Sequence, residues 1–283
     1  MELSGRELAK PVLQYVKTEA LSLNKRGVKP KLAIITVGGE DAWFSYVTQK
    51  VKTAGRLGIA TELVNLSGES EDELFDILRK LNQDESINGI IVQRPLPKNF
   101  NRERIVNSIS REKDIDGFRQ DSPYEVPAWL AVKDFISEAN SLSRDASEVL
   151  TASNFQNSLL NQSILILGKG ETAGKPVIEG FRKIGIDPVI VDSKTKNPQD
   201  LLREADIVVC AVGKRGVVKK EFLKPGCILV GIGIHKENGK LIGDYAEEEI
   251  KDIVRAYTPT PGGVGPLNLA YLFKNLIEAA KKS

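Results

Sequence analysis

The pattern of apolar and polar positions divides the chain into blocks. Blocks with the spacing of a helix alternate with short apolar blocks typical of strands. Apolar residues recur at helical spacing over 4–24, which predicts an amphipathic helix. The run 31–37 is short, apolar and rich in β-branched residues, and two glycines end it, as expected for a buried strand. The same reasoning predicts helices over about 41–57, 70–82, 126–142 and 267–281 and one ending near 184, and strands at 61–66, 89–92, 163–167, 188–191, 206–212 and 226–230.

Strands that alternate with helices predict βαβ units and a parallel sheet, so the fold class is α/β. Two such series are present, and the second begins at Ser163. Residues 98–125 are polar and are predicted to be rich in loops, while 140–158 are rich in Ser and Asn and are predicted to be a surface connection. A length of 283 residues fits one large domain or two ordinary ones.

Composition narrows the class of protein. Apolar residues make up 41% and charged residues 28%, as in globular proteins, and the formal net charge is +2. No Lys/Arg block indicates nucleic acid, no apolar window could span a membrane, and no signal peptide is evident. Cys210 and Cys227 lie in apolar runs and are predicted to be reduced core residues. Because His235 is the only histidine, no metal site is predicted.

One candidate for chemistry is the pair Tyr46 and Lys50. Four residues apart on a predicted helix, they project from one face, and a phenol beside an amine can handle a proton. On spacing alone the pair is more typical of a solvated helix face. Gln93 follows a predicted strand, where α/β sheets bind ligands. Asp116 lies in a KDIDG segment that, in isolation, is more typical of turn chemistry.

A glycine turn opens the second series. Gly168, Gly170 and Gly174 follow a strand and lead into a helix, which is the context in which a backbone approaches a pyrophosphate. The next strand ends at Asp192, where an acid usually accepts from a ribose hydroxyl and repels a 2′-phosphate. Lys169, Ser193, Lys194 and Lys196 are donors that favour the phosphate. These residues alone leave NAD and NADP open.

Several segments, in order, resemble the bifunctional methylenetetrahydrofolate dehydrogenase/methenyltetrahydrofolate cyclohydrolase family. The most specific are VQRPLP at 92–97 and PGGVGP at 261–266, which leads into the last predicted helix. The others are YVTQK (46–50), KDIDGF (113–118), GKP (174–176), AVGK (211–214) and KPG (224–226). The resemblance covers nearly the whole chain.

The resemblance implies two α/β domains. The first would be a catalytic folate-binding domain with a parallel sheet, formed by residues 1–119 and 267–283. The second would be a Rossmann-type dinucleotide-binding domain, formed by residues 120–266. It also implies two reactions in one-carbon metabolism and purine biosynthesis. A hydride leaves 5,10-methylenetetrahydrofolate for the nicotinamide, and water then converts the methenyl product into 10-formyltetrahydrofolate.

Residue roles are carried over by position. Lys50 would be the catalytic lysine, Tyr46 would stack on or orient the folate, Gln93 would hydrogen-bond Lys50, and Asp116 would bind the pterin. The same matches imply folate contacts at Pro261, Gly262 and Gly263. For the dinucleotide they imply Gly168, Lys169, Gly170, Gly174, Ser193, Lys194 and Ile234.

Departures from the family pattern fall mainly in the dinucleotide half. Asp192 stands where the family has His, so NAD stays possible, but Lys169, Ser193 and Lys194 favour NADP. In the folate half, Arg94 replaces a Leu and either meets an acidic glutamate tail or lies in solvent. The remaining departures are Trp43, Val126-Pro127-Ala128-Trp129, Gly231 and Asn268.

Two other functions stay open. The chain could be another two-domain dehydrogenase, of the shikimate or amino-acid type, or a dinucleotide-sensing module without catalysis. Neither accounts for the Pro/Gly loops together with Tyr46, Lys50, Gln93 and Asp116. The resemblance further implies a homodimer formed through the dinucleotide-binding domain. From composition and cysteine usage we expect a cytoplasmic protein with no nucleic-acid or membrane partner.

Overall fold

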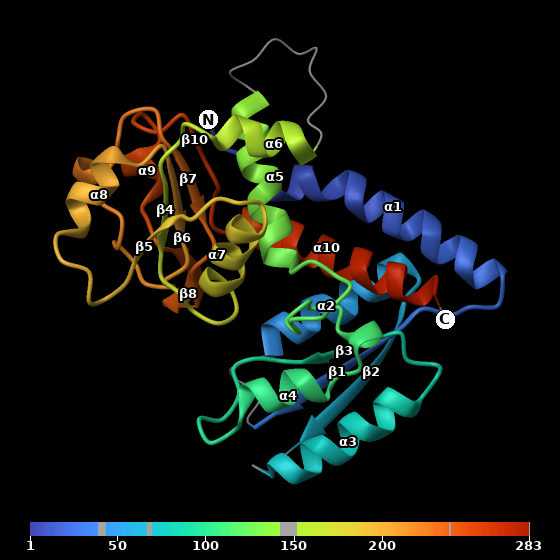
Figure 1. The fold of residues 1–283 in the computed structure, drawn as a ribbon. Helices are drawn as coiled ribbons and strands as arrows, with labels where there is room; N and C mark the ends of the chain where they lie inside the picture. The colour runs from blue at the N-terminus through green and yellow to red at the C-terminus, as the bar shows by residue number, and fades with distance from the viewer. Residues whose placement is uncertain (39–43, 67–69, 142–151, 238, 283) are drawn as a thin grey trace. The chain divides into compact units, whose positions relative to one another are not determined.

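The computed structural model describes residues 1–283 except 39–43, 67–69, 142–151, 238 and 283 (Figure 1). Trp43 lies outside the described residues. The chain forms two compact units. The Lys50 unit comprises Lys10–Pro127 and Leu269–Ser283, and the Gly168 unit comprises Met1–Ala9 and Ala128–Asn268.

A three-stranded parallel sheet organises the Lys50 unit, with strand order β2-β1-β3. Its strands are β1 (Lys31–Val37), β2 (Ala60–Leu66) and β3 (Gly89–Val92). The helices that contribute to this unit are α1 (Gly5–Lys25), α2 (Phe44–Leu57), α3 (Glu71–Gln83), α4 (Arg102–Ser108) and α10 (Val264–Ala280), with a 3-10 turn, η2, at Arg111–Lys113.

Helices cover both faces of this sheet. Leu32 and Ile34 of β1 pack with α1, α2 and α10, whereas Ala33 and Ile35 pack with α3 and α4. Figure 1 shows α2 and α3 on opposite sides of the strands. Since successive residues of a strand point to opposite faces, a strand buried on both sides must be apolar throughout. The apolar run Leu32–Ile35 of β1 follows from this three-layer packing.

The Gly168 unit contains a five-stranded parallel sheet and a hairpin. The sheet order is β10-β7-β6-β4-β5, and β8 pairs antiparallel with β9. Its strands are β4 (Ile164–Leu167), β5 (Val189–Val191), β6 (Ile207–Cys210), β7 (Ile228–Gly231), β8 (Ile234–Glu237), β9 (Lys240–Gly243) and β10 (Ala256–Tyr257). Its helices are α5 (Pro127–Ser141), α6 (Ala152–Leu159), α7 (Gly174–Lys183), α8 (Pro198–Glu204) and α9 (Glu247–Ile250), with η3 at Lys220–Phe222.

Strand β4, which lies between β6 and β5 in the larger sheet, is where the chain reverses direction across the sheet. After β4 the chain places β5 on one side and then β6 on the other. In open α/β sheets, ligands bind outside the carboxyl ends of the strands at such a switch point. The order of this sheet therefore marks the loops after Leu167 and after Cys210 as the expected ligand-binding edge.

Most predicted elements are present, and the α/β class with parallel sheets is confirmed. Ser70 caps α3 at its N-terminus, since its Oγ accepts from the Glu73 backbone N–H at 3.3 Å. Both cysteines are free and buried. Within the described part of the chain, no helix is long and apolar enough to cross a membrane.

Two predictions of irregular structure were wrong in part. The region 98–125 contains α4, whose N-cap Asn101 accepts from the Arg104 backbone N–H at 3.0 Å. The region 140–158 contains α6, although 142–151 lie outside the described residues. Ser and Asn favour loops, but Phe155 of α6 is buried beside Trp129, and that burial outweighs local propensity.

Trp129 is the centre of an aromatic cluster in the Gly168 unit. Its ring lies edge-on to Phe181 at 4.8 Å and to Phe155 at 6.4 Å. Gly180 of α7 lies against the indole, since a Cβ at Gly180 would come within 2.2 Å of it. The departure from the family pattern at Val126–Trp129 therefore begins α5 and supplies a core residue.

Gly180→Ala is expected to lower the thermal unfolding temperature of the Gly168 unit. The added methyl overlaps Trp129, and overpacking of this kind costs about 1–3 kcal/mol, more than the gain in helix propensity. Gly55→Ala is the matched control, because a Cβ there meets nothing within 4 Å in α2. Calorimetry of both variants checks this. An unchanged unfolding temperature for Gly180→Ala would show that the indole can move away.

Candidate active site

Lys50 and Gln93 meet in the Lys50 unit. Lys50 is on α2, and Gln93 directly follows β3. The backbone N–H of Gln93 still donates to the Ile35 carbonyl of β1. The Lys50 Nζ donates to Gln93 Oε1 at 2.6 Å, as expected from the resemblance. Gln93 is buried, and its own amide donates to the Arg94 carbonyl at 2.8 Å, which fixes the orientation of its oxygen.

Burial lowers the pKa of Lys50 below its usual range, and the carboxylate of Asp116 opposes this effect. A partly buried amine that is held by one neutral acceptor loses its proton more readily than a solvated lysine. Lys50 is therefore suited to activate water or to exchange a proton with a bound ligand.

The two acids of the KDIDG segment have different environments. Asp114 is buried, and its carboxylate accepts from the backbone N–H groups of Arg119 at 2.9 Å and Phe118 at 3.4 Å. Burial raises the pKa of Asp116 to about 6, against the opposing charges of Lys50 and Arg94. Asp114 thus holds the loop together, whereas Asp116 is the acid beside Lys50.

Lys113 and Asn275 fix the ends of this loop. The Lys113 Nζ donates to three carbonyls at the C-terminal end of α3, those of Leu81, Asn82 and Asp84, at 2.8–2.9 Å. From α10, the Asn275 amide donates to the carbonyls of Ile115 at 2.9 Å and Glu125 at 3.0 Å. Asn275 was not predicted as a site residue, and its only signal in the sequence is that it is a polar residue in an otherwise apolar stripe of the helix.

Tyr46 lies one turn before Lys50 on α2 and is 42% exposed. Partial burial raises the pKa of its phenol, so it is neutral and available for stacking or hydrogen bonding at neutral pH. Arg94 is not a solvated side chain, because its guanidinium lies over the Phe118 ring at 5.0 Å from the centroid.

In the Gly168 unit, the glycine turn occupies the switch point of the sheet. Gly168 follows β4 with φ +89, and a Cβ there would overlap the Ala211 carbonyl after β6. A Cβ on Gly174 would come within 2.1 Å of the Gly168 carbonyl, so the turn closes tightly onto the start of α7. Gly170 has open space around it. This geometry leaves the N-terminus of α7 suited to a phosphate.

The carboxylate of Asp192, which directly follows β5, is bound by two residues of its own unit. Lys169 Nζ contacts Asp192 Oδ2 at 2.7 Å, and the Lys194 backbone N–H donates to Oδ1 at 2.9 Å. The hydrogen bond from Lys169 holds the pKa of Asp192 below its usual range. Ser193 and Lys194 are exposed beside this ion pair.

Two other predicted contacts lie in the same unit. Ile234 begins β8 and packs against Gly213. A Cβ added at Gly213 would lie 3.2 Å from the Ile234 carbonyl. Asp244 fixes the adjacent loop, since its carboxylate accepts from the backbone N–H groups of Val212 and Lys214 at 3.2 and 2.8 Å. This buried acid was not predicted from the sequence.

Pro261, Gly262 and Gly263 form the turn before α10, in the Gly168 unit. Gly262 has φ +121 and accepts from the Gly5 backbone N–H at 2.8 Å. A Cβ on Gly263 would come within 2.6 Å of the Pro259 carbonyl. Backbone packing alone therefore accounts for both glycines.

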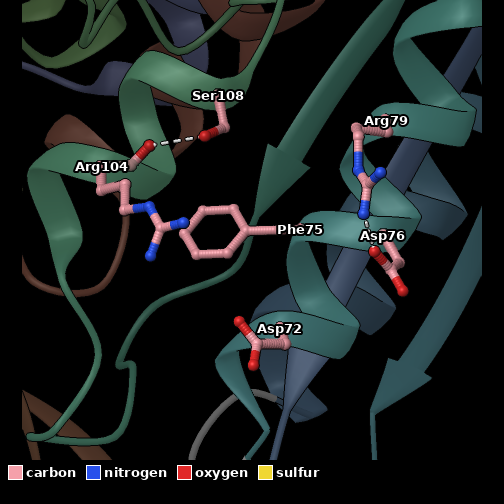
Figure 2. A pocket seen from close by; sticks show the side chains of 6 residues that line it. All are labelled: Asp72, Phe75, Asp76, Arg79, Arg104 and Ser108. Atoms are coloured by element: carbon pink, nitrogen blue, oxygen red, sulfur yellow. Dashed lines mark hydrogen bonds and ion pairs between the residues drawn. The ribbon is translucent and has the colours of Figure 1, made fainter.

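A separate surface hollow lies between α3 and α4 (Figure 2). Arg104 lies over the Phe75 ring at 4.2 Å, and Ser108 Oγ donates to the Arg104 carbonyl. Arg79 pairs with Asp76. The lining is Asp72, Phe75, Asp76, Arg79, Arg104 and Ser108, which includes no predicted site residue. We assign no ligand to it.

Comparison with known proteins identifies both halves. The tetrahydrofolate dehydrogenase/cyclohydrolase catalytic domain matches residues 3–116, and the NAD(P)-binding domain of the same family matches residues 145–283. The chain belongs to the tetrahydrofolate dehydrogenase/cyclohydrolase family. The bifunctional protein FolD of Staphylococcus epidermidis is 35% identical over 281 residues, which cover 99% of this chain and 96% of that protein.

Solved structures of this family share the fold. The bifunctional FolD enzyme of Campylobacter jejuni matches with a TM-score of 0.81 and 29% identity, covering 100% of this chain and 99% of that one. The Trypanosoma brucei FolD, solved with NADP and an inhibitor, matches with a TM-score of 0.79 and 27% identity, covering 100% and 97%. The predicted family, fold and bifunctional activity are thereby confirmed.

The compact units and the family domains divide the chain at different residues. The units change at Pro127 and Ala128, and residues 1–9 group with the Gly168 unit because Leu3 and Gly5 pair with Tyr257 and Gly262. The NAD(P)-binding domain match runs through the last helix. The functional boundaries at 119 and 267 stay predictions. Among the described residues, no group of three or more His, Cys, Asp or Glu could hold a metal ion.

Proposed function

We propose that the chain oxidises 5,10-methylenetetrahydrofolate with NADP and hydrolyses the methenyl product to 10-formyltetrahydrofolate. The observation that carries the proposal is the cluster of Lys50, Gln93 and Asp116 within a chain of this family. The 1–119 and 267–283 parts would bind folate, and 120–266 would bind the dinucleotide. The product places the enzyme in one-carbon metabolism, upstream of purine biosynthesis.

Lys50 would serve the hydrolytic step. With its proton given to solvent, the amine can take a proton from water as the water attacks the methenyl carbon. Its lowered pKa limits repulsion of the cationic substrate, and Gln93 holds the amine in place without adding charge. As the ring opens, the proton gained by Lys50 can pass to the departing ring nitrogen.

Asp116 and Tyr46 would hold the substrate. An ionised carboxylate accepts two parallel N–H donors in the way that it pairs with a guanidinium, and a pterin presents such donors side by side. The phenol ring of Tyr46, on the same helix face as Lys50, offers a flat apolar surface for the folate ring. Pro261, Gly262 and Gly263 are proposed as further folate contacts.

The glycine turn at the switch point fits a dinucleotide. Gly168 and Gly174 have no room for side chains, and the N–H groups at the start of α7 are suited to a pyrophosphate. When bound, NADP supplies the hydride acceptor. We assign the pyrophosphate to Gly168, Gly170 and Gly174, and a further contact to Ile234.

NADP is preferred to NAD in this proposal, and the ion pair of Lys169 with Asp192 supports it. Lys169 masks the acid that would repel a 2′-phosphate, and Ser193 and Lys194 add exposed donors beside it. The family's NAD(P)-binding domain and the NADP complex of the Trypanosoma brucei enzyme support the same choice.

Lys169→Ala is expected to raise KM for NADP about tenfold and to leave KM for NAD within twofold. Loss of the ammonium removes one charge-assisted contact and unmasks Asp192, which costs about 1–2 kcal/mol with the phosphorylated cofactor alone. Lys183→Ala, an exposed lysine at the end of α7, is the control. Steady-state kinetics with each cofactor check this, and an equal loss for both cofactors would contradict a phosphate contact.

A substrate panel tests the proposed function. The purified protein is mixed with methylenetetrahydrofolate, shikimate or an amino acid, each with NADP and with NAD, and cofactor reduction is followed. We expect reduction with the folate alone. Reduction with shikimate or an amino acid would favour another two-domain dehydrogenase, and binding of dinucleotide without any reduction would favour a sensing module.

Assembly and location are part of the proposal. We infer a homodimer formed through the dinucleotide half and a cytoplasmic protein. Light scattering of the purified chain would give twice its mass of 31.1 kDa. A mass of one chain at micromolar concentration would contradict the dimer.

A further inference from the structure

Arg94 directly follows Gln93 and contacts the loop that carries Asp116 and Phe118. Its guanidinium packs on the Phe118 ring at 5.0 Å, and its carbonyl accepts from the Gln93 amide at 2.8 Å. Phe118 is two residues after Asp116, so the cation–π contact holds a permanent positive charge against the loop that carries this acid, and that charge favours its ionised form. Contacts on both its backbone and its side chain keep Arg94 at this place.

The charges around Asp116 come from three directions. Lys50 faces it from α2, Arg94 from the loop after β3, and Asp114 from its own loop. Lys50 and Arg94 stabilise the ionised carboxylate, whereas Asp114 and burial oppose ionisation. Lys50 is an unreliable counter-ion, because the proposed hydrolysis requires it to give up its proton. Arg94 cannot do so, since a guanidinium stays protonated throughout the physiological range.

We propose that Arg94 is a positioning residue that keeps Asp116 ionised while Lys50 is neutral. The inference rests on the proposed folate function, because it assumes that the Asp116 carboxylate accepts the pterin donors. It separates the two tasks of the site. Lys50 is free to change its charge during hydrolysis, and Arg94 maintains the anion that binds substrate. An Arg at this position therefore acts through Asp116 and not on the one-carbon unit.

The test compares Arg94→Gln, which keeps the length and loses the charge, with Arg94→Lys, which keeps the charge. The Asp116 carboxyl is titrated by NMR in full-length protein carrying 13C-labelled aspartate, with its signal assigned from Asp116→Asn. We expect a midpoint near pH 6 in the parent. In Arg94→Gln we expect it about 1 unit higher, as for loss of a nearby opposite charge. In Arg94→Lys we expect it near the parent value.

Kinetics give a second measurement on the same proteins. A shift of this size lowers kcat/KM of Arg94→Gln for methylenetetrahydrofolate about fivefold at pH 6, and the deficit vanishes above pH 8. The loss is in KM, with kcat kept. A loss that is the same at every pH would indicate a merely structural role and would overturn the proposal.

Other outcomes are equally decisive. An unchanged Asp116 midpoint in Arg94→Gln, with weaker binding of polyglutamylated folate only, would assign Arg94 to an acidic tail instead. If Arg94→Gln fails to fold, Phe118→Leu, which removes the ring under the guanidinium, is expected to raise the midpoint, and an unchanged midpoint there would overturn the proposal. If the Asp116 midpoint differs between the parent and Arg94→Gln but the parent does not turn over folate, the proposed function is refuted. The coupling between Arg94 and Asp116 would still stand.

Discussion

Lys50→Met abolishes cyclohydrolase activity and leaves part of the dehydrogenase activity, if Lys50 serves mainly the hydrolytic step. Methionine keeps the length of the side chain and removes the only amine that contacts Gln93 among the described residues. Loss of a positioned base costs about 10²–10⁴-fold in rate. Hydride transfer depends on how two bound ligands are held, so it should fall by about tenfold or less.

The two activities are measured separately on each protein. Methenyltetrahydrofolate decay without dinucleotide reports hydrolysis, and cofactor reduction reports hydride transfer. Lys52→Met is the matched control, since Lys52 is exposed on the same helix. If Lys50→Met lost both activities equally, the lysine would serve both steps and the proposed division would fail.

Asp116→Asn has the second large effect, on substrate binding. An amide offers one acceptor and a donor where the pterin presents donors, so a charge-assisted pair is lost and a repulsive contact replaces it. We expect kcat/KM for methylenetetrahydrofolate to fall about 100-fold, mainly in KM. Steady-state kinetics and binding of a folate analogue check this. Unchanged KM would mean that the pterin binds elsewhere.

The same substitution is expected to stabilise the folded protein. The pKa of Asp116 is about 6 in the folded state, against about 3.9 in an unfolded chain. Between these values the folded protein binds the extra proton, so its stability falls as pH rises from about 4 to about 6 and then stays constant. Asp116→Asn removes this loss, which is on the order of 1–2 kcal/mol for a partly exposed carboxylate.

Thermal unfolding at several pH values measures that gain. The unfolding temperature of Asp116→Asn should exceed that of the parent above pH 6 and match it near pH 4. Asp72→Asn, an exposed acid in the same unit, should give no such pH-dependent difference. A variant that is less stable than the parent at pH 7 would show that the Asp116 anion is well compensated by Lys50 and Arg94.

Periodicity predicted the strands and long helices because each is buried on defined faces. The apolar run of β1 and the glycine turn after β4 are local signals with one structural solution. Helix α6 was missed because its Ser and Asn residues favour loops, while the burial of Phe155 depends on Trp129, 26 residues earlier.

The site was harder to predict than the fold. Lys50 and Gln93 are 43 residues apart, and their contact follows from the place of α2 beside the end of β3 and not from any local pattern. The segment KDIDG does not show which acid faces a ligand. That depends on the backbone donors of Phe118 and Arg119, which satisfy Asp114 and leave Asp116 beside Lys50. The place of Arg94 over Phe118 likewise required the structure.

One time course tests the central claim most directly. The parent protein is given methylenetetrahydrofolate and NADP, and reduced cofactor, methenyltetrahydrofolate and 10-formyltetrahydrofolate are measured together. The account predicts that reduced cofactor equals the sum of the two folate products, with 10-formyltetrahydrofolate appearing faster than spontaneous hydrolysis allows. No cofactor reduction with either NADP or NAD, or methenyltetrahydrofolate that decays only at the spontaneous rate, would contradict it.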